Sequence, residues 1–556
     1  MLDPLWRHRA LAALTEPFDI IVIGAGITGC GITLDAAQRG LRVLLVERGD
    51  IASGTSSRSS KLIHGGLRYL KQMQFRITRL ACRERDRMLA LSPHLVTPVR
   101  FIYPAYEGDR TPGWQVDFGL WMYDRLTNRP ERHAHLDAGE VQSLAPGLEV
   151  DGLDRALAYS DAMADDARLT LAVASTAAAY GAAVLTRCAA ERAVRDGRGH
   201  VTGIFARDLE SGVGRNVEAA VVVNATGVWT DEVRERLGLA GRRLRPSRGI
   251  HLMLRRDAVP VTAALTIPSP DDGRPVFLVP HPEGVLLGTT DVYHEGSLDD
   301  PRPTADEVGY LRRALAAAFP ALPDDGDVVA GTFAGLRPIL DTHAEDPSEA
   351  SREEDIWEEE GLLSVAGGKL TTWRATAEEA VDEAIKLLPE HRARRAAPCA
   401  TAGTPLAGLA PSDLASRLAA SHRLDELVAA AMARRLGSLA WAACELATKR
   451  RDLHPLLEGT DLTAAEARAH LRWGGVLHLE DLLLRRVRYG MWDPAKARAL
   501  VRPLRHVCQK ELGWRYRTWE AEVERFDQAL EPWTLEGVEE SHKTTEPEKT
   551  ETTDSA

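Results

Sequence analysis

Three closely spaced glycines and a later glutamate carry the clearest chemical meaning in this chain. The motif GAGITG, residues 24–29, stands between a strand-like apolar run and a segment with helical periodicity. In that setting Gly24 allows a tight turn, Gly26 lets a pyrophosphate approach the backbone, and Gly29 lets helix and strand pack closely. Glu47 ends the next apolar run, 18 residues after Gly29, where a carboxylate can accept hydrogen bonds from ribose hydroxyls. A chance glycine turn beside a surface glutamate does not explain this combination, so we predict dinucleotide binding.

A segment rich in glycine and small hydroxyl residues follows, from Ala52 to Tyr69. It has too little apolar surface to form a core element. It suits a backbone that lies along an extended cofactor, with hydroxyls donating to phosphate and ribityl oxygens. A generic serine-rich surface loop is the alternative, and the polar side chains of Lys61, His64, Arg68 and Tyr69 in the same segment argue against it.

Two arginines and a lysine have the chemistry to bind an anionic substrate. Arg68 and Arg337 each follow a glycine-containing turn, and a guanidinium offers a phosphate both charge and bidentate geometry. Lys369 stands in Gly367–Thr372, after the apolar run 362–365, where we expect a helix to begin and its positive end to stabilise an anion. A surface salt bridge worth about 0–1 kcal/mol is the alternative for any single arginine. An ordinary strand-to-helix turn is the alternative for the lysine.

Apolar runs predict the elements that position these residues. Parallel strands are expected at 18–23, 43–46 and 219–223, and an antiparallel hairpin at 276–279 and 285–288. From about residue 396 the composition changes to Ala, Leu, Arg and Glu with helical spacing, as in 424–436 and 464–488.

We therefore predict an α/β protein: a Rossmann-like dinucleotide-binding domain with an inserted antiparallel-sheet substrate domain, plus a C-terminal α-helical domain. The dinucleotide-binding domain and the substrate domain are expected to be interleaved over residues 1–395, with the parts of the substrate domain at roughly 78–155 and 240–335. The helical domain is expected over 396–535. An acidic tail, 536–556, has almost no apolar residues, and we expect it to be disordered.

Composition excludes several classes of protein. The net charge of −12 argues against a nucleic-acid binder, which normally carries a basic surface. The six cysteines are scattered without a CxxC pair or close cluster, so we expect no disulfide frame and no metal site among them. The N-terminus lacks the apolar region of a signal peptide, and no window approaches the roughly 18 apolar residues of a membrane-spanning helix. We expect a cytoplasmic protein or one attached to a membrane face.

The motif SSKLIHGGLRYL, residues 59–70, resembles the signature of FAD-dependent glycerol-3-phosphate dehydrogenases. The resemblance continues in the same order along the chain, through FGLWMYD (118–124), DDARL (165–169), VNATG (223–227), GTTD (288–291), GLRP (335–338) and LSVAGGKLTTWR (363–374). Trp373 departs from this pattern, because relatives often have tyrosine there. The resemblance implies a D-amino-acid-oxidase-like fold in which the dinucleotide-binding domain is an FAD-binding domain.

The resemblance also implies roles for matching residues. Arg68, Tyr69, His251, Arg337 and Lys369 are expected to bind substrate, and His64, His251, Arg337 and Lys369 to form the catalytic set. The expected FAD contacts are Gly24, Gly26, Gly29, Glu47, Thr55, Ser56, Ser60, Lys61, Leu62, His64, Thr226, Gly227, Gly368, Lys369, Leu370 and Thr371.

The implied reaction oxidises sn-glycerol 3-phosphate to dihydroxyacetone phosphate by hydride transfer to flavin N5. A histidine with an unperturbed pKa of about 6.5 suits the accompanying proton transfer, and the choice between His64 and His251 stays open. Oxidases of the family commonly carry an extra insertion in the substrate domain, and this sequence has no obvious long one, which favours a membrane quinone over oxygen as electron acceptor. A flavoprotein acting on a 2-hydroxy acid or amine, and a non-catalytic flavin-binding scaffold, are further alternatives. The oligomeric state stays open, with a homodimer as one alternative.

Membrane attachment would be peripheral, at the inner face of the cell membrane. Two segments combine basic and apolar residues at helical spacing, His64–Arg87 and Trp473–Trp492. Such helices can lie in an anionic lipid surface. For either segment, a helix that covers the core with a solvated basic face is the alternative.

Overall fold

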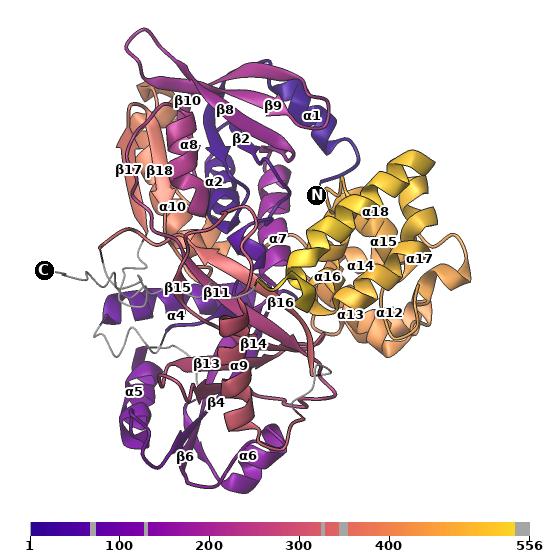
Figure 1. Cartoon of the computed structure of the whole chain (residues 1–556). Helices are drawn as coiled ribbons and strands as arrows, with labels where there is room; N and C mark the ends of the chain where they lie inside the picture. Colours follow the sequence, from indigo (N-terminus) through magenta and orange to yellow (C-terminus); the bar gives the residue numbers. More distant parts are fainter. Residues whose placement is uncertain (1, 67–73, 127–131, 324–327, 344–353, 540–556) are drawn as a thin grey trace, which may run out of the picture.

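Two β-sheets and a separate group of helices make up the part of the chain that the structure describes. This computed structural model describes residues 2–66, 74–126, 132–323, 328–343 and 354–539. Figure 1 shows the first sheet above the second, with the C-terminal helices to one side of both. The predicted fold class is confirmed: an α/β dinucleotide-binding domain, an inserted antiparallel sheet and a C-terminal helical domain.

The first sheet is parallel at its centre. Its strand order is β17 (Asp355–Glu359), β18 (Leu362–Ala366), β10 (Gly214–Asn224), β1 (Phe18–Ile23), β2 (Val43–Val46) and β7 (Ala183–Leu185). β8 (Cys188–Arg195) and β9 (Val201–Asp208) extend it as an antiparallel ribbon on β10. The predicted return of the chain at residues 219–223 is confirmed, because β10 pairs in parallel with β1.

Both faces of this sheet are covered, which is why the paired stretches 20–23 of β1 and 43–46 of β2 are apolar. In β1, Ile20 and Val22 belong to one buried cluster, whereas Ile21 and Ile23 belong to another on the opposite face. The first face is covered by α2 (Ile27–Gln38), α7 (Asp166–Ala179) and α10 (Trp373–Leu387). α1 (Trp6–Ala13) and α8 (Thr230–Arg236) pack on the other side.

The second sheet is antiparallel apart from the pairing of β4 with β12. Its strand order is β15 (Val292–Tyr293), β11 (Ser247–Leu254), β14 (Val285–Gly288), β13 (Pro275–Pro280), β12 (Ala264–Pro268), β4 (Val96–Tyr106), β6 (Leu153–Ala164) and β3 (Leu62–Ile63). β16 (Val329–Arg337) pairs with β11, and β5 (Ala134–Leu136) pairs with β6. The predicted hairpin is confirmed as β13 and β14.

Four helices accompany the second sheet: α4 (Phe75–Leu91), α5 (Gly113–Leu126), α6 (Ala138–Leu144) and α9 (Ala305–Ala318). α4 and α5 contact each other, and α4 also contacts β4 whereas α5 contacts β6. α9 packs against β11 and β12. The strands of this sheet come from two stretches of chain, 62–164 and 247–337, so the polypeptide leaves the first sheet twice to build it. The domain boundaries that we inferred from sequence stay predictions.

After residue 390, the regular secondary structure in the described part of the chain is helical, apart from isolated bridges. Its helices are α11 (Glu390–Ala393), α12 (Leu414–His422), α13 (Glu426–Leu436), α14 (Leu439–Cys444), α15 (Ala464–Trp473), α16 (Tyr489–Trp492), α17 (Pro494–Leu512) and α18 (Tyr516–Leu530). The helical pattern of residues 464–488 is not one continuous helix. Gly474 and Gly475 follow α15, and Gly475 has a φ of 62°, so the helix ends and a π-helical turn forms at Asp481–Arg486.

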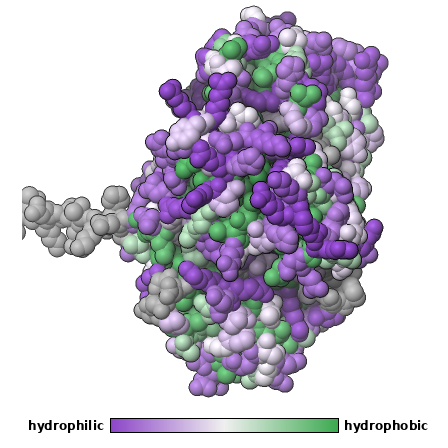
Figure 2. All heavy atoms as spheres, turned by 90° about the vertical axis from the view of Figure 1, so that its right-hand side faces the viewer, coloured by the Kyte–Doolittle hydropathy of each residue, from purple (hydrophilic) through white to green (hydrophobic). Residues whose placement is uncertain are grey.

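The prediction that the second segment, Trp473–Trp492, binds the membrane is wrong. Its leucines 482–484 lie in the core of the helical domain. Its arginines are buried too: Arg486 pairs with Asp50 at 2.6 Å and Arg485 with Asp481 at 2.6 Å. The outer face of the helical domain is largely hydrophilic, with apolar side chains in small separate groups (Figure 2). Among the described helices, none is both long and apolar enough to span a bilayer.

Candidate active site

The glycine motif forms a turn that leaves no room for side chains. After β1, Gly24 has a φ of 104°, and a Cβ there would lie 2.8 Å from the carbonyl oxygen of Ala225. A Cβ on Gly29 would lie 1.9 Å from the Gly24 carbonyl oxygen. α2 begins at Ile27, so the unpaired N–H groups of its first turn open toward the space beside the motif.

Hydrogen bonds to Glu47 hold this turn against the end of β2. Its carboxylate accepts hydrogen bonds from the backbone N–H of Ala25 at 2.7 Å and of Gly49 at 2.6 Å. Burial raises the pKa of Glu47, and the two backbone donors act against that rise. Ser56 adds a second tie, because its hydroxyl accepts from the N–H of Ile27 at 2.8 Å.

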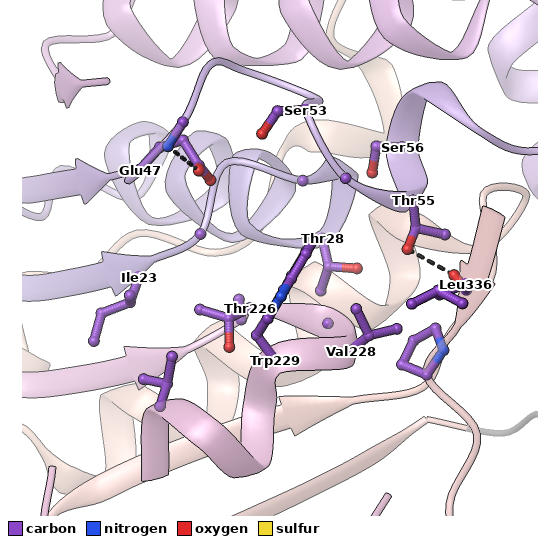
Figure 3. Close-up of a pocket in the computed structure, with 18 of the residues that line it drawn as sticks. Ile23, Thr28, Glu47, Ser53, Thr55, Ser56, Thr226, Val228, Trp229 and Leu336 are labelled. Carbon is purple, nitrogen blue, oxygen red and sulfur yellow. Dashed lines mark hydrogen bonds between the residues drawn. The ribbon is translucent and has the colours of Figure 1, made fainter. Parts of the chain in front are cut away.

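A cavity of about 330 Å³ runs along this turn. Figure 3 shows Glu47 and Ser53 at one side, Thr55 and Leu336 at the other, and Thr226 and Trp229 between them. The predicted cofactor residues that line it are Gly24, Gly26, Glu47, Thr55, Ser56, Thr226, Gly227, Gly368, Lys369 and Leu370. Those that do not are Gly29, Ser60, Lys61, Leu62, His64 and Thr371. The sequence analysis missed Arg58 and Trp229, which also line the cavity.

His251 lies on β11 and is not one of the residues that line the cavity. Its Nε2 is 2.8 Å from the hydroxyl of Ser60, and its ring stacks on Phe333 with centroids 4.8 Å apart. Burial, with the nearby charges of Arg337 and Lys61, holds the pKa of His251 well below its ordinary value, so the ring is neutral. Gly288 makes room for it, because a Cβ there would lie 2.3 Å from the imidazole.

Arg337 ends β16 close to His251. Its guanidinium donates to Asp291 at 3.0 Å and to the hydroxyl of Thr289 at 3.1 Å. Gly249 on the neighbouring strand accommodates it, since a Cβ there would lie 2.3 Å from Nη2. Arg337 is therefore held in place by a carboxylate before any ligand is considered.

Lys61 points into a buried ion cluster. Its ammonium lies 2.8 and 2.9 Å from the two carboxylate oxygens of Asp166 and donates to the carbonyl of Ser57 at 3.1 Å. Arg488 of the helical domain reaches the same carboxylate at 3.0 Å, and Ser59 donates to it through both its hydroxyl and its N–H. Burial and the charge of Arg488 lower the pKa of Lys61 to about 8, against the opposing effect of Asp166.

The turn after β18 brings Lys369 to the cavity. We expected Gly367–Thr372 to open a helix, but α10 begins only at Trp373, because Gly367 and Gly368 both adopt positive φ. Lys369 therefore lies in a turn before the helix. Thr371 connects this turn to β3, since its hydroxyl accepts from the N–H of His64 at 3.2 Å. The other predicted substrate residues, Arg68 and Tyr69, lie outside the described residues.

Comparison with known proteins agrees with this geometry over nearly the whole chain. The family described as FAD dependent oxidoreductase matches residues 19–383, and the C-terminal domain of alpha-glycerophosphate oxidase matches 399–518. A glycerol-3-phosphate dehydrogenase of Mycobacterium leprae is 36% identical over 94% of this chain and 89% of its own length. Glycerol-3-phosphate dehydrogenase 2 of Mycobacterium tuberculosis is 36% identical over 96% of this chain and 92% of its own. This chain belongs to the FAD-dependent glycerol-3-phosphate dehydrogenase family.

A solved structure supports the assignment. The glycerol-3-phosphate dehydrogenase from Bacillus halodurans, complexed with FAD, superposes with a TM-score of 0.78 and 26% identity, covering 97% of this chain and all of the other. The cofactor of this family fits the cavity described above. The Gly24 turn admits a pyrophosphate, the first turn of α2 offers it N–H donors, and the Glu47 carboxylate stands where ribose hydroxyls can donate.

Proposed function

We propose that this member of the family oxidises sn-glycerol 3-phosphate to dihydroxyacetone phosphate. The observation that carries the proposal is the 36% identity, over 94% of the chain, with a protein named glycerol-3-phosphate dehydrogenase. The cationic side chains near the cavity support it, because a phosphate dianion in a partly dry pocket needs charge compensation. We assign Arg68, Arg337 and Lys369 to this task, and Tyr69 to hydrogen bonding with the substrate phosphate or hydroxyls.

FAD supplies the redox chemistry when it is bound, because flavin N5 accepts a hydride from the carbinol carbon of the substrate. The work of the chain is to position the substrate and to move a proton. Lys369, in the turn before α10, lines the cavity where its positive charge would favour a reduced, more negative ring.

The proton of the substrate hydroxyl goes to His64 or His251. His251 is buried and neutral, and its Nδ1 has no hydrogen-bond partner among the described residues. His64 is partly exposed and joined through its backbone to Thr371. Replacing each by Gln and measuring flavin reduction under anaerobic conditions identifies the base. An unchanged rate in both variants would exclude both residues.

We propose a membrane quinone as electron acceptor, and oxygen, with release of hydrogen peroxide, as the alternative. The absence of an obvious long insertion in the substrate-domain sequence supports the quinone. The assay supplies glycerol 3-phosphate with a quinone analogue, or with dissolved oxygen at an oxygen electrode. Faster turnover with oxygen would reverse the assignment.

We also propose that α4 and α5 form the surface that meets the membrane. Trp114, Phe118 and Trp121 of α5 are 59%, 56% and 44% exposed and recur at helical spacing. Arg125 lies 3.9 Å above the ring of Trp121. The adjacent helix α4 exposes further arginines, Arg76, Arg79 and Arg83. Interfacial aromatic residues beside basic ones suit an anionic lipid surface.

Flotation with anionic liposomes tests this surface. The variant Trp114→Ser/Phe118→Ser should float less than the unmodified protein. The control is Tyr180→Ser, at an exposed aromatic residue that directly follows α7 beside the first sheet, and it should float to the same extent as the unmodified protein. Equal flotation of both variants would refute the assignment.

The proposed activity itself is tested by mixing the FAD-loaded protein with glycerol 3-phosphate without oxygen. Bleaching of the oxidised flavin spectrum is expected. Bleaching by a 2-hydroxy acid or an amine, but not by glycerol 3-phosphate, would require another substrate class. No bleaching by any of these would favour a binding protein without this activity.

A further inference from the structure

A group of histidine and carboxylate side chains lies between α5 and β5, away from the cofactor cavity. His133 and His135 flank Ala134 at the start of β5, so both side chains lie on the same face of the strand. Asp117 of α5 faces them. Its Oδ1 is 3.0 Å from His133 Nε2, and its Oδ2 is 3.3 Å from His135 Nε2.

A second carboxylate orients the first of these histidines. His133 Nδ1 lies 2.6 Å from Oδ2 of Asp124, and the same oxygen accepts from the His133 N–H at 3.1 Å. This contact directs the other ring nitrogen, Nε2, at Oδ1 of Asp117, 3.0 Å away. An imidazole nitrogen and a carboxylate oxygen at this separation are both atoms that can bind one metal ion.

The group is accessible from solvent. Asp117 also contacts Arg155, whose Nη1 lies 3.3 Å from Asp117 Oδ2, so a bound ion would share this carboxylate with a guanidinium. Side-chain exposure rises from 15% at His133 and 23% at Asp117 to 58% at His135, so the group opens to solvent on one side. Water can therefore complete a coordination sphere.

We propose that Asp117, His133 and His135 bind one divalent transition-metal ion, of which Zn²⁺ fits best. Imidazole and carboxylate are ligands that Zn²⁺ accepts, whereas Mg²⁺ and Ca²⁺ prefer oxygen ligands alone. Ligand atoms placed tetrahedrally at about 2.0–2.1 Å from zinc are about 3.3 Å from one another. Nε2 of His133 and Oδ1 of Asp117 already have this separation to within a few tenths of an ångström. One ligand atom from each of the three residues lies within 4.8 Å of the others.

Asp124 provides the hydrogen bond to a ligand imidazole that metal sites in proteins commonly have. A carboxylate that receives the second imidazole N–H fixes the ring and increases its basicity, and Asp124 does this for His133. The ion would join α5 to the edge strand β5. None of these residues lines the cofactor cavity, so the site is independent of the proposed oxidation chemistry.

Calorimetric titration tests the proposal. FAD-loaded protein without a polyhistidine tag is dialysed against chelator, returned to buffer and titrated with ZnCl₂. We expect one ion per chain, loss of detectable binding in His135→Gln, and weakening by about 10–100-fold in Asp124→Asn, which alters only the supporting carboxylate. His343→Gln, at an exposed histidine outside the group, is the matched control and should bind as the unmodified protein does.

His135 is exposed, so its variant is expected to fold, and unchanged flavin content verifies this. Absence of saturable binding at one ion per chain would overturn the proposal. Undiminished binding by His135→Gln would overturn it equally, since the zinc would then lie elsewhere.

Discussion

The buried cluster of Lys61, Asp166 and Arg488 allows a prediction about charge balance. Two cations share a single carboxylate, and all three side chains are buried, so the cluster carries a net charge of +1. Asp166→Asn removes the carboxylate that both cations contact and leaves them without an ion-pair partner among the described residues, with Asp165 as a more distant negative charge. Breaking a buried pair in this way costs about 3–5 kcal/mol of folding free energy.

Arg488→Met breaks the same contact with a smaller expected loss. Lys61 and Asp166 remain as a neutral pair, and the hydrogen bonds that are lost all come from Nη2 of Arg488. They go to Asp166 at 3.0 Å, to the Ser57 carbonyl at 3.2 Å and to the sulfur of Met491 at 2.9 Å. One hydrogen bond of a charged group is worth about 1.5–3 kcal/mol, and because these acceptors share the single nitrogen Nη2, we take the value of one such bond as the expected loss. Nε and Nη1 of Arg488 have no hydrogen-bond partner within the described part of the chain, so methionine also removes an unsatisfied group.

The double variant gives the sharpest test. Asp166→Asn/Arg488→Met leaves Lys61 as the remaining cation of the cluster, and because its pKa is already lowered to about 8, this ammonium can lose its proton. The double variant should therefore be more stable than Asp166→Asn alone.

Flavin fluorescence released on heating, at one scan rate, measures the effect. At about 2 °C per kcal/mol, the lower end for larger domains, we expect shifts of about 6–10 °C for Asp166→Asn and about 3–6 °C for Arg488→Met. Glu390→Gln, which breaks an exposed ion pair with Arg394, is the control and should not shift measurably. Equal shifts for the two single variants, or a double variant less stable than Asp166→Asn, would refute the charge-balance reasoning.

Three further predictions follow from the site and the domain contacts. Glu47→Gln should raise the dissociation constant of FAD about tenfold, measured by fluorescence titration of the apoprotein, because a charged acceptor is lost; unchanged affinity would remove Glu47 from the cofactor site. Gly288→Ala should slow flavin reduction by at least about tenfold, since its Cβ would displace His251, whereas Gly119→Ala, with open space around it, should have no effect. For His478, burial lowers the pKa, but hydrogen bonds to two glutamates raise it to about 9, above the value of about 6.5 expected when unfolded. Its stabilising contribution is therefore complete below pH 6.5 and is lost as the pH rises through 9, so His478→Gln should flatten the pH dependence of thermal stability in that window.

Local spacing was sufficient to predict several residues that line the cavity beside the glycine turn. Gly24, Gly26 and Glu47 could be assigned because a strand, a tight turn and a helix are short-range features, and their glycines report on backbone geometry directly. The hairpin at 276–288 and the parallel strand at 219–223 were predictable for the same reason, since each is a short apolar run bounded by turn residues.

Other features depended on contacts between distant parts of the chain. Asp166 and Arg488 are separated by 322 residues, and no spacing rule connects them. The burial of Trp473–Trp492 could not be predicted from the sequence either. A basic amphipathic pattern is the same whether its arginines contact lipid or pair with a buried carboxylate, as Arg486 does with Asp50.

The sequence by itself determined the fold class, the glycine turn and the family, because these depend on residue types at fixed short separations. Only the tertiary structure decided that Lys61 turns into an ion cluster, that Lys369 precedes its helix, and that Asp117 meets two histidines of an edge strand. Side-chain direction depends on which elements pack together, and packing sums many weak contacts over the whole chain.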